Sequence, residues 1–414
     1  MGGREIGVVG AGVVGMSAAL YLQRDGHKVS VIDARAPGTL TSYGNAGGIV
    51  TGAVTPTSTP DLWREIPTML FDRASPIRLR WRYLPRLAPW LVRFLLAGRK
   101  AQVEKSAAAL APILAQANDA HRELAALSGI HDVLRPVGWL KVYETENGFA
   151  GSALERELMA RHGIKFAVLN QDELRQLEPH LAPRFIKGLF QPDSGFASYP
   201  WKLVDGYGQY FAQAGGQFLR EKVRRLEPRD GGGVRVRSER GIRNFDGVVV
   251  AAGAWSAKLA TQLGDRVSLE AERGYHLNLD PGDAGELRRP VVFPERVFAM
   301  APMQDGIRIN SGIELAGLDA PPDFSRIYKL LPHARAALPG LSDRVNREWM
   351  GYRPSTPDSV PVIGQSPRCP SVIYAFGHGH LGLTLGPATG RLVAAVVAGR
   401  AAGIDLTPYR PERF

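Results

Sequence analysis

The stretch EWMGYRPSTPDSVPVIG, residues 348–364, sets one arginine, Arg353, before a proline-rich turn. A guanidinium is planar, so it can donate two parallel hydrogen bonds to one carboxylate. Pro354 and Pro357 stiffen the backbone after it and limit where the side chain can point. Burying this charge without a partner is costly. The partner could be a ligand carboxylate, which we favour, or Asp358, which would form a structural ion pair.

A second chemical signal is the glycine spacing in EIGVVGAGVVGMSAALYLQRDGHKVSVIDAR, residues 5–35. Gly10 permits a tight turn, Gly12 lets the backbone approach a pyrophosphate, and Gly15 lets a helix pack on a strand. Asp33 ends the next apolar run, where its carboxylate can accept hydrogen bonds from a ribose. Because strand, glycines, helix, strand and acid occur in this order, the stretch predicts a dinucleotide site, with NAD and FAD both open.

Residues 41–52, TSYGNAGGIVTG, are small, polar and rich in glycine. Their backbone N–H groups could bind an anion or the edge of a flavin ring. A plain surface loop is the alternative, but the position directly after the second strand of the dinucleotide unit favours a functional loop.

Strands and helices of the fold must position these residues. Short apolar runs predict buried parallel strands at 6–9, 29–32 and 248–252. Helices are expected over 101–128, 152–163, 170–179, from 201 onward, near 324–337, and after the glycine-rich turn at 376–390; further strands are expected over 138–145 and around 223, in a hairpin before 248, and as an antiparallel sheet within 267–315.

The interleaving of these pieces predicts an α/β fold. We expect a discontinuous Rossmann-like dinucleotide domain with an inserted α+β substrate domain built on an antiparallel sheet. The expected dinucleotide-domain segments are 1–55, 149–265 and 343–414, and the expected substrate-domain segments are 56–148 and 266–342.

The amino-acid composition argues against several other classes of protein. The 414 residues carry 51 Lys+Arg against 40 Asp+Glu, a formal net charge of +11, but no dense basic run or nucleic-acid motif. The single cysteine, Cys369, cannot form an intrachain disulfide, and we expect no metal site. An early strand in place of a signal peptide, and no apolar run of about 18 residues, predict a cytoplasmic protein without a spanning helix.

Residues 61–100 differ in character, since tryptophans such as Trp63, Trp81 and Trp90 alternate with arginines. This mixture suits peripheral contact with the inner face of the cell membrane. A lid or domain-docking segment with extended arginines is the alternative, and we favour it slightly.

Taken together, five motifs resemble the FAD-dependent D-amino-acid oxidase superfamily, and most closely its D-amino-acid dehydrogenase small-subunit family. They are VVGAGVVGMSAALYLQRDGHKVSVID, TSYGNAGGIVTG, FDGVVVAAGAWS, YRPSTPDSVPVIG and FGHGHLGLTLGPATG, and they span nearly the whole chain. The resemblance implies FAD rather than NAD, in a domain of the glutathione-reductase type. It also implies hydride transfer from an amino acid to flavin N5, giving an imine that water hydrolyses to a 2-oxo acid and ammonia.

By this resemblance the cofactor contacts are Gly10, Gly12, Val13, Val14, Gly15, Asp33, Ala34, Arg35, Ser42, Asn45, Ala46, Gly47, Gly48, Ile49, Val223, Ala252, Gly253, Trp255, Gly377, His378, Gly379, His380, Leu381, Gly382, Leu383 and Thr384. His378 and His380 are candidates for the floor of the active site, or they only shape their turn; both interpretations stay open.

Arg353 matches the family arginine that binds the substrate carboxylate, and Arg273 is a second, weaker anchor candidate. Tyr275 and His276 are candidates to line the substrate pocket, although strand residues alternate faces, so we do not expect both to line it. Arg353, Arg273, Tyr275, His276 and His380 are therefore the candidate catalytic residues.

Some relatives attach FAD through a cysteine just before the matching Thr-Pro-Asp, and EWMGYRPSTPD has none, so we expect non-covalent FAD. His380 departs from the commoner dehydrogenase motif, which leaves the substrate open and includes a cyclic D-hydroxyproline. Electrons are expected to pass to a quinone, an electron-transfer protein or another non-oxygen acceptor. The alternatives are an oxidase of glycine or sarcosine-type amines, and a flavin subunit of a larger dehydrogenase.

Overall fold

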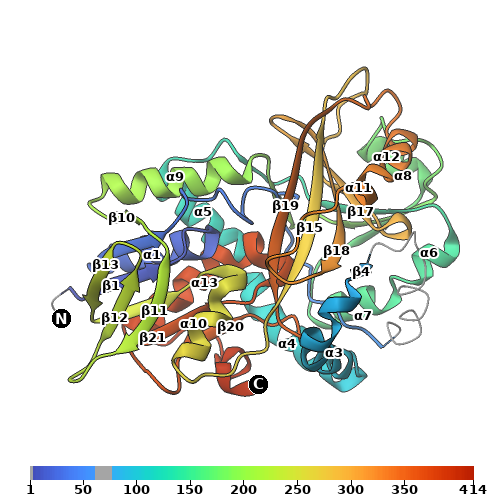
Figure 1. Cartoon of the computed structure of the whole chain (residues 1–414). Helices are drawn as coiled ribbons and strands as arrows, with labels where there is room; N and C mark the ends of the chain where they lie inside the picture. Colours follow the sequence, from blue (N-terminus) through green and yellow to red (C-terminus); the bar gives the residue numbers. More distant parts are fainter. Residues whose placement is uncertain (1–2, 61–76) are drawn as a thin grey trace.

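The computed structural model describes residues 3–60 and 77–414, and Figure 1 shows two regions, each built on its own large sheet. Among the described residues, a six-stranded sheet has the order β10-β2-β1-β14-β21-β20, and all its pairings are parallel except that of β20 with β21. Its strands are β1 (Glu5–Val9), β2 (Lys28–Asp33), β10 (Gln217–Arg220), β14 (Gly247–Val250), β20 (Val362–Gln365) and β21 (Val372–Phe376).

The second large sheet has nine strands among the described residues, ordered β19-β15-β18-β17-β16-β6-β8-β7, with β4 beside β18. Its strands are β4 (Ile77–Leu79), β6 (Trp139–Tyr143), β7 (Ala167–Leu169), β8 (Lys187–Gln191), β15 (Glu270–Leu279), β16 (Val291–Phe293), β17 (Phe298–Met303), β18 (Gly306–Leu315) and β19 (Val345–Ser355). Its neighbours β15, β16, β17, β18 and β19 pair antiparallel, as the sequence predicts for 267–315.

Two small sheets contain the other strands of the described residues. One is formed by β11 (Val223–Pro228), β12 (Val234–Ser238) and β13 (Gly241–Phe245), and the other by β3 (Gly48–Ile49), β9 (Gly195–Ala197) and β5 (Leu134–Arg135). The predicted hairpin before β14 is the antiparallel β12–β13 pair.

The helices are α1 (Val13–Arg24), α3 (Leu84–Ala97), α4 (Lys100–Ala115), α5 (Ala117–Ser128), α6 (Glu146–Ala150), α7 (Ala153–Arg161), α8 (Gln171–Leu177), α9 (Pro200–Gln213), α10 (Ser256–Gln262), α11 (Ser325–Tyr328), α12 (Leu331–Ala337) and α13 (Gly382–Val397). Two of the predicted helices differ in detail from the observed ones. The helix expected over 101–128 is split at Gln116, which ends α4 and precedes α5. The helix expected near 324–337 is also two helices, because Pro332 starts a new one.

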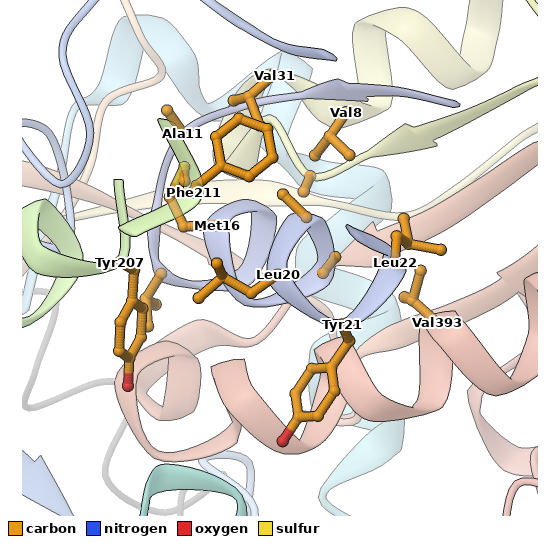
Figure 2. Packing of buried hydrophobic residues seen from close by; sticks show 14 of the residues in the cluster. Val8, Ala11, Met16, Leu20, Tyr21, Leu22, Val31, Tyr207, Phe211 and Val393 are labelled. Atoms are coloured by element: carbon orange, nitrogen blue, oxygen red, sulfur yellow. The ribbon is translucent and has the colours of Figure 1, made fainter. Parts of the chain in front are cut away.

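Helix α1 is enclosed by the six-stranded sheet, α9 and α13. Figure 2 shows Tyr207 and Phe211 of α9 and Val393 of α13 around it. The approach of α13 is close, because a Cβ at Gly390 would stand 2.6 Å from the backbone of Ser17. This packing fixes α1 and α13 relative to each other.

The strand pairing differs from the expected division of the chain at two places. β7 and β8 fall within 149–265, which was expected in the dinucleotide domain, yet they pair with β6 of the nine-stranded sheet. β19, which carries Arg353, falls within 343–414 and pairs with β15 of the same sheet. Arg353 therefore reaches the site from the antiparallel sheet.

Candidate active site

The turn between β1 and α1 has the geometry that its glycine spacing predicts. Gly10 has a φ of 114°, and a Cβ there would stand 2.3 Å from the Ala251 carbonyl oxygen. At Gly15 a Cβ would stand 1.9 Å from the Gly10 carbonyl oxygen. At Gly12 the φ is −73°, and the nearest atom to a Cβ would be the Ser42 hydroxyl oxygen at 3.4 Å. The fold thus requires glycine at 10 and 15, whereas at 12 the missing side chain leaves room for a ligand.

Asp33 is the last residue of β2 and lies against this turn. Its carboxylate accepts the backbone N–H of Ala11 at 2.8 Å and that of Arg35 at 2.9 Å. Each carboxylate oxygen has a further lone pair, so Asp33 can also accept hydrogen bonds from a ribose. The Glu221 N–H donates to the Asp33 carbonyl at 2.9 Å, and β11 begins at Val223 just beyond it. The predicted contacts Asp33 and Val223 therefore lie at the same end of β2.

The loop at 41–52 lies against the first turns of α1 and α13. The Ser42 hydroxyl accepts the Val13 N–H at 3.0 Å. Thr384 Oγ1 accepts the Val50 N–H at 3.1 Å. The loop is therefore tied to two helix N-termini, whose partial positive charge suits an anionic cofactor.

The second predicted cofactor motif follows β14. Gly253 has a φ of 53°, and a Cβ there would meet no protein atom within 4 Å. The Trp255 ring meets the Tyr352 ring edge-on with centroids 5.3 Å apart. Since Tyr352 precedes Arg353, this motif borders the strand that carries the arginine.

The turn before α13 also leaves open space. Gly377 and Gly379 have positive φ values of 84° and 50°, and a Cβ at Gly379 or Gly382 would meet no protein atom closer than 3.5 Å. His378 is buried, and its Nε2 lies 2.9 Å from Thr389 Oγ1. Burial lowers the pKa of His378 to about 3, so its ring is neutral near pH 7. This contact supports the turn-shaping interpretation of His378. The open glycines here and at the first turn fit a cofactor such as FAD.

Arg353 lies near the end of β19, opposite Glu272 on β15. Its Nη1 donates to the Gly312 carbonyl at 2.9 Å, and its Nη2 would be only 2.2 Å from a Cβ at Gly274. Burial lowers the pKa of Arg353, and the charge of Glu272 opposes that change. Within residues 3–60 and 77–414, no carboxylate lies within the 4.0 Å ion-pair distance of its guanidinium. Its remaining donors are available to an anion.

Asp358, the structural partner that the sequence left open for Arg353, is engaged elsewhere. Its Oδ2 lies 2.9 Å from Nε of Arg413. The Val360 N–H also donates to Asp358 Oδ1 at 3.2 Å. The ion pair between Arg353 and Asp358 is therefore absent from the described part of the chain, and the ligand interpretation remains.

The candidate catalytic residues on the paired strands β15 and β19 divide between the two faces of that pair. Arg273 pairs with Tyr352, whereas Glu272 pairs with Arg353, so Arg273 and Arg353 point to opposite faces. The fully buried Arg273 donates to the carbonyls of Gly317 at 2.8 Å and Ala320 at 2.6 Å. These contacts favour a structural role for Arg273 rather than the predicted second anchor.

Tyr275 lies on the same face as Arg273, and its hydroxyl donates to Glu314. His276 lies on the face of Arg353, as expected from the alternation of side chains along a strand. Its Nδ1 carries a proton, because it lies 2.9 Å from the Gly44 carbonyl, which can only accept. Burial and the nearby Arg308 charge lower the pKa of His276 to about 3. His276 is thus a neutral support of the 41–52 loop.

Two site residues have no motif in the sequence. Arg308 on β18 is fully buried and donates to the carbonyls of Tyr43 at 3.1 Å and Asn45 at 3.0 Å, so it also holds the 41–52 loop. Glu272 is buried and its Oε2 lies 3.1 Å from His380 Nε2. For both residues the only sequence signal was a charged side chain within a strand. β15 is buried along its whole length and β18 in part, and a charged residue in a buried strand is unusual.

Burial raises the pKa of the Glu272 carboxyl, but the His380 hydrogen bond and the charges of His380 and Arg353 outweigh it, so the net pKa is lowered. Glu272 is therefore ionised near pH 7. It lines a cavity of about 310 Å³ together with His380 and the turn at 378–381. Phe94, Leu110, Ile313 and Leu381 supply apolar wall.

The basic, tryptophan-rich segment expected to be a membrane-contact or docking element is described only from residue 77, so Trp63 lies outside the described residues. Helix α3 docks inward through Trp90, whose Nε1 donates to the Ser355 carbonyl at 3.1 Å, and through Phe94, stacked on Trp90 at 4.9 Å. Val92 of α3 and Trp81, which precedes the helix, are exposed. None of the described helices is long and apolar enough to cross a membrane.

Known proteins resemble this chain over nearly its whole length. The family model described as FAD dependent oxidoreductase (DAO) matches residues 5–396. A D-amino-acid oxidase of Bradyrhizobium diazoefficiens is 36% identical over 420 residues, covering 100% of this chain and 99% of the relative. D-amino acid dehydrogenase 2 of Mesorhizobium japonicum is 30% identical over 418 residues, covering 97% of this chain and 98% of the relative.

Among solved structures, glycine oxidase from Geobacillus kaustophilus has a TM-score of 0.76 at 22% identity, covering 99% of each chain. L-proline dehydrogenase from P. horikoshii also has a TM-score of 0.76, at 18% identity, covering 100% of this chain and 98% of that one. At these identities the likeness shows the fold alone.

Proposed function

The chain belongs to the DAO family of FAD-dependent oxidoreductases, and from this premise we propose that it oxidises a D-amino acid whose carboxylate is bound by Arg353. The observation that carries the proposal is the half-buried guanidinium of Arg353, which has one carbonyl partner and, in the described part of the chain, no carboxylate partner. A cyclic amino acid such as a D-hydroxyproline is among the candidate substrates.

The reaction removes a hydride from the substrate Cα and a proton from its nitrogen. When the substrate is a primary amino acid, the resulting imine takes up water to give a 2-oxo acid and ammonia. Bound FAD would supply the hydride-acceptor chemistry. The electrons then leave to a quinone, an electron-transfer protein or another non-oxygen acceptor.

The residues of the chain orient the substrate and exclude water from it, and they form no covalent bond with it. Arg353 fixes the substrate carboxylate, which limits how the Cα–H can be presented. Asp33 and the Gly12 turn would hold the adenosine and pyrophosphate parts of FAD, and the 41–52 loop and the first turn of α13 would hold its ring system. His276 and Arg308 keep that loop in place.

We propose that FAD is bound without a covalent link. Cys369 is buried in the core beside β20 and β21, and burial raises the pKa of its thiol, which makes it a poor nucleophile. Release of all flavin into the supernatant on acid precipitation is the expected result, and flavin that stays with the pellet contradicts it.

An oxidase that reduces O₂ is the second candidate, because the relative at 36% identity is named a D-amino-acid oxidase. Peroxide formation during turnover in air distinguishes this function from reduction of a quinone or dye. A flavin subunit of a larger dehydrogenase is a further alternative, and turnover by the isolated chain would argue against it.

The experiment that tests the proposed function is anaerobic flavin bleaching with a panel of D- and L-amino acids. Loss of the flavin absorbance with one or more D-amino acids is expected, with the L-enantiomers much slower. A panel that leaves the flavin oxidised throughout would refute the proposal.

We also propose peripheral contact with an anionic membrane surface through the outer side of residues 81–100. Exposed Trp81 and Val92 lie among exposed arginines, including Arg82 and Arg93, which suits an interface with acidic lipids. Co-sedimentation with vesicles containing anionic lipid, but not with neutral vesicles, is the expected result.

A further inference from the structure

Two oppositely charged side chains lie side by side on one face of the β15–β19 pair and yet remain apart. Glu272 and Arg353 are direct cross-strand partners, so their side chains share a face and their Cβ atoms are close. The Arg353 guanidinium extends over Gly274 and binds the Gly312 carbonyl. The Glu272 carboxylate instead lies 3.1 Å from His380 Nε2.

This separation has a steric and an electrostatic cause. The missing side chain of Gly274 provides the space in which the guanidinium lies, one strand repeat beyond Glu272. His380, at the turn before α13, holds the carboxylate from the other side. A half-buried cation and a buried anion are thus presented next to each other, each with unused hydrogen-bonding capacity.

An amino acid carries the complementary pair of charges on adjacent groups. Its carboxylate matches Arg353, and its amino group matches Glu272. On the basis of the proposed function, we propose that Glu272, held by His380, binds the α-amino group of the substrate whose carboxylate is bound by Arg353.

The position of Glu272 supports this role over a purely structural one. Glu272 lines the cavity of about 310 Å³. The neighbouring acid on the same face, Glu270, accepts the Tyr83 hydroxyl at 3.1 Å and is not among the lining residues of that cavity. The charged groups that face Glu272 are His380 from the turn before α13, Arg353 from β19 and Glu270 from its own strand. Arg273 points to the opposite face of β15.

The test compares two ligands that differ only in the amino group, 2-aminoisobutyrate and isobutyrate. Neither can be oxidised at Cα by the proposed reaction, because 2-aminoisobutyrate has no Cα–H and isobutyrate has no amine. Binding to the FAD-loaded protein is measured by calorimetry, so the readout does not depend on turnover. The wild-type protein is expected to bind 2-aminoisobutyrate about tenfold or more tighter, since a hydrogen bond to a charged group is worth roughly that factor.

Glu272→Gln is expected to remove most of that preference while leaving the affinity for isobutyrate unchanged. Glu272→Asp, which keeps the charge on a shorter side chain, should give an intermediate preference. Glu270→Gln is the matched control, because it neutralises a buried carboxylate on the same face, and it should keep the wild-type preference. FAD content and melting temperature verify that each variant is folded.

Equal wild-type affinity for the two ligands would overturn the inference, and this outcome requires no variant. Equal weakening of both ligands by Glu272→Gln would also overturn it, because it indicates a structural role. A wild-type protein that binds neither ligand would instead refute the carboxylate site at Arg353, and with it the proposed function on which the inference rests.

Discussion

The guanidinium of Arg353 occupies the space that a side chain at Gly274 would fill. A Cβ at Gly274 would stand 2.2 Å from Nη2 and 2.3 Å from Cζ of Arg353. The two residues lie on neighbouring antiparallel strands, so the glycine on β15 determines where the arginine from β19 can lie. Several predictions about the site depend on this relationship and on the separate faces of β15.

Replacing Arg353 by Lys or Ala should remove the fork that binds the substrate carboxylate. We expect kcat/KM to fall by about 10²-fold, mainly through a higher KM, because hydrogen bonds between charged groups are each worth about 1.5–3 kcal/mol. FAD should be retained, as measured by flavin absorbance per protein. Unchanged kinetics would exclude Arg353 as the anchor.

Gly274→Ala should displace the guanidinium without a change at Arg353 itself. The atoms that the new methyl group meets are the end of a flexible side chain, so we expect the melting temperature to change little and KM to rise as for Arg353→Lys. Gly195→Ala is the control, since a Cβ there meets no atom closer than 3.6 Å. A Gly274→Ala variant with wild-type KM would show that the guanidinium position is not important for substrate binding.

Arg273→Met should mainly lower stability and Arg353→Met should mainly lower activity, although both remove an arginine from the same pair of strands. Arg273 is fully buried and binds the carbonyls of Gly317 and Ala320, so its loss should lower the free energy of unfolding by about 2–4 kcal/mol. Arg353→Met should mainly lower kcat/KM. Urea unfolding and steady-state kinetics on both variants test this. Similar stability losses in both would contradict the separation of the two faces.

Gly12→Ala should weaken FAD binding while leaving the protein folded. The backbone at Gly12 suits any residue, with a φ of −73°, and the nearest protein atom would be 3.4 Å from the new Cβ. The methyl group would therefore occupy ligand space rather than protein space. Lower flavin content at an unchanged apoprotein melting temperature is expected. Gly10→Ala, at a φ of 114°, should instead destabilise the protein.

Stability should depend on pH through buried neutral histidines. Burial lowers the pKa of His121 to about 4 from an ordinary value of 6.5, and its Nε2 lies 2.9 Å from the Leu383 carbonyl. Between those pH values the unfolded chain binds more protons than the folded protein, so the free energy of unfolding falls as the pH falls, by up to about 1.4 kcal/mol per pH unit for this residue.

His121→Gln keeps a donor for the Leu383 carbonyl but cannot take up the proton. The stability of the wild type relative to this variant should therefore decrease steadily from pH 6.5 to pH 4. Urea unfolding at three pH values in this range measures the difference. Parallel stability curves for the two proteins would contradict a neutral, buried His121.

The sequence predicted the parts of the site that are local. The first glycine turn, Asp33 and the following loop lie within about 50 residues of chain, and their order alone implies how they meet. The alternation along β15 predicted that Tyr275 and His276 would not share a face, as the structure confirms. The alternation could not show which of the two side chains points toward the site, because that orientation depends on the partner strands.

The contacts that sequence reasoning missed are long-range. Glu272 and His380 are separated by 108 positions, and Arg308 and Tyr43 by 265. No spacing rule relates such residues, since tertiary packing alone brings them together. The sheet that β7, β8 and β19 join could not be read from the sequence for the same reason, because strand pairing decides which sheet a strand joins.

The ion pair between Asp358 and Arg413 has a consequence for selectivity. Asp358 follows the Arg353 strand closely, and its carboxylate is restrained by Arg413 and by the Val360 N–H. Because Arg413 neutralises the carboxylate of Asp358, that carboxylate forms no ion pair with Arg353 among the described residues, and the charge of Arg353 is left for a ligand.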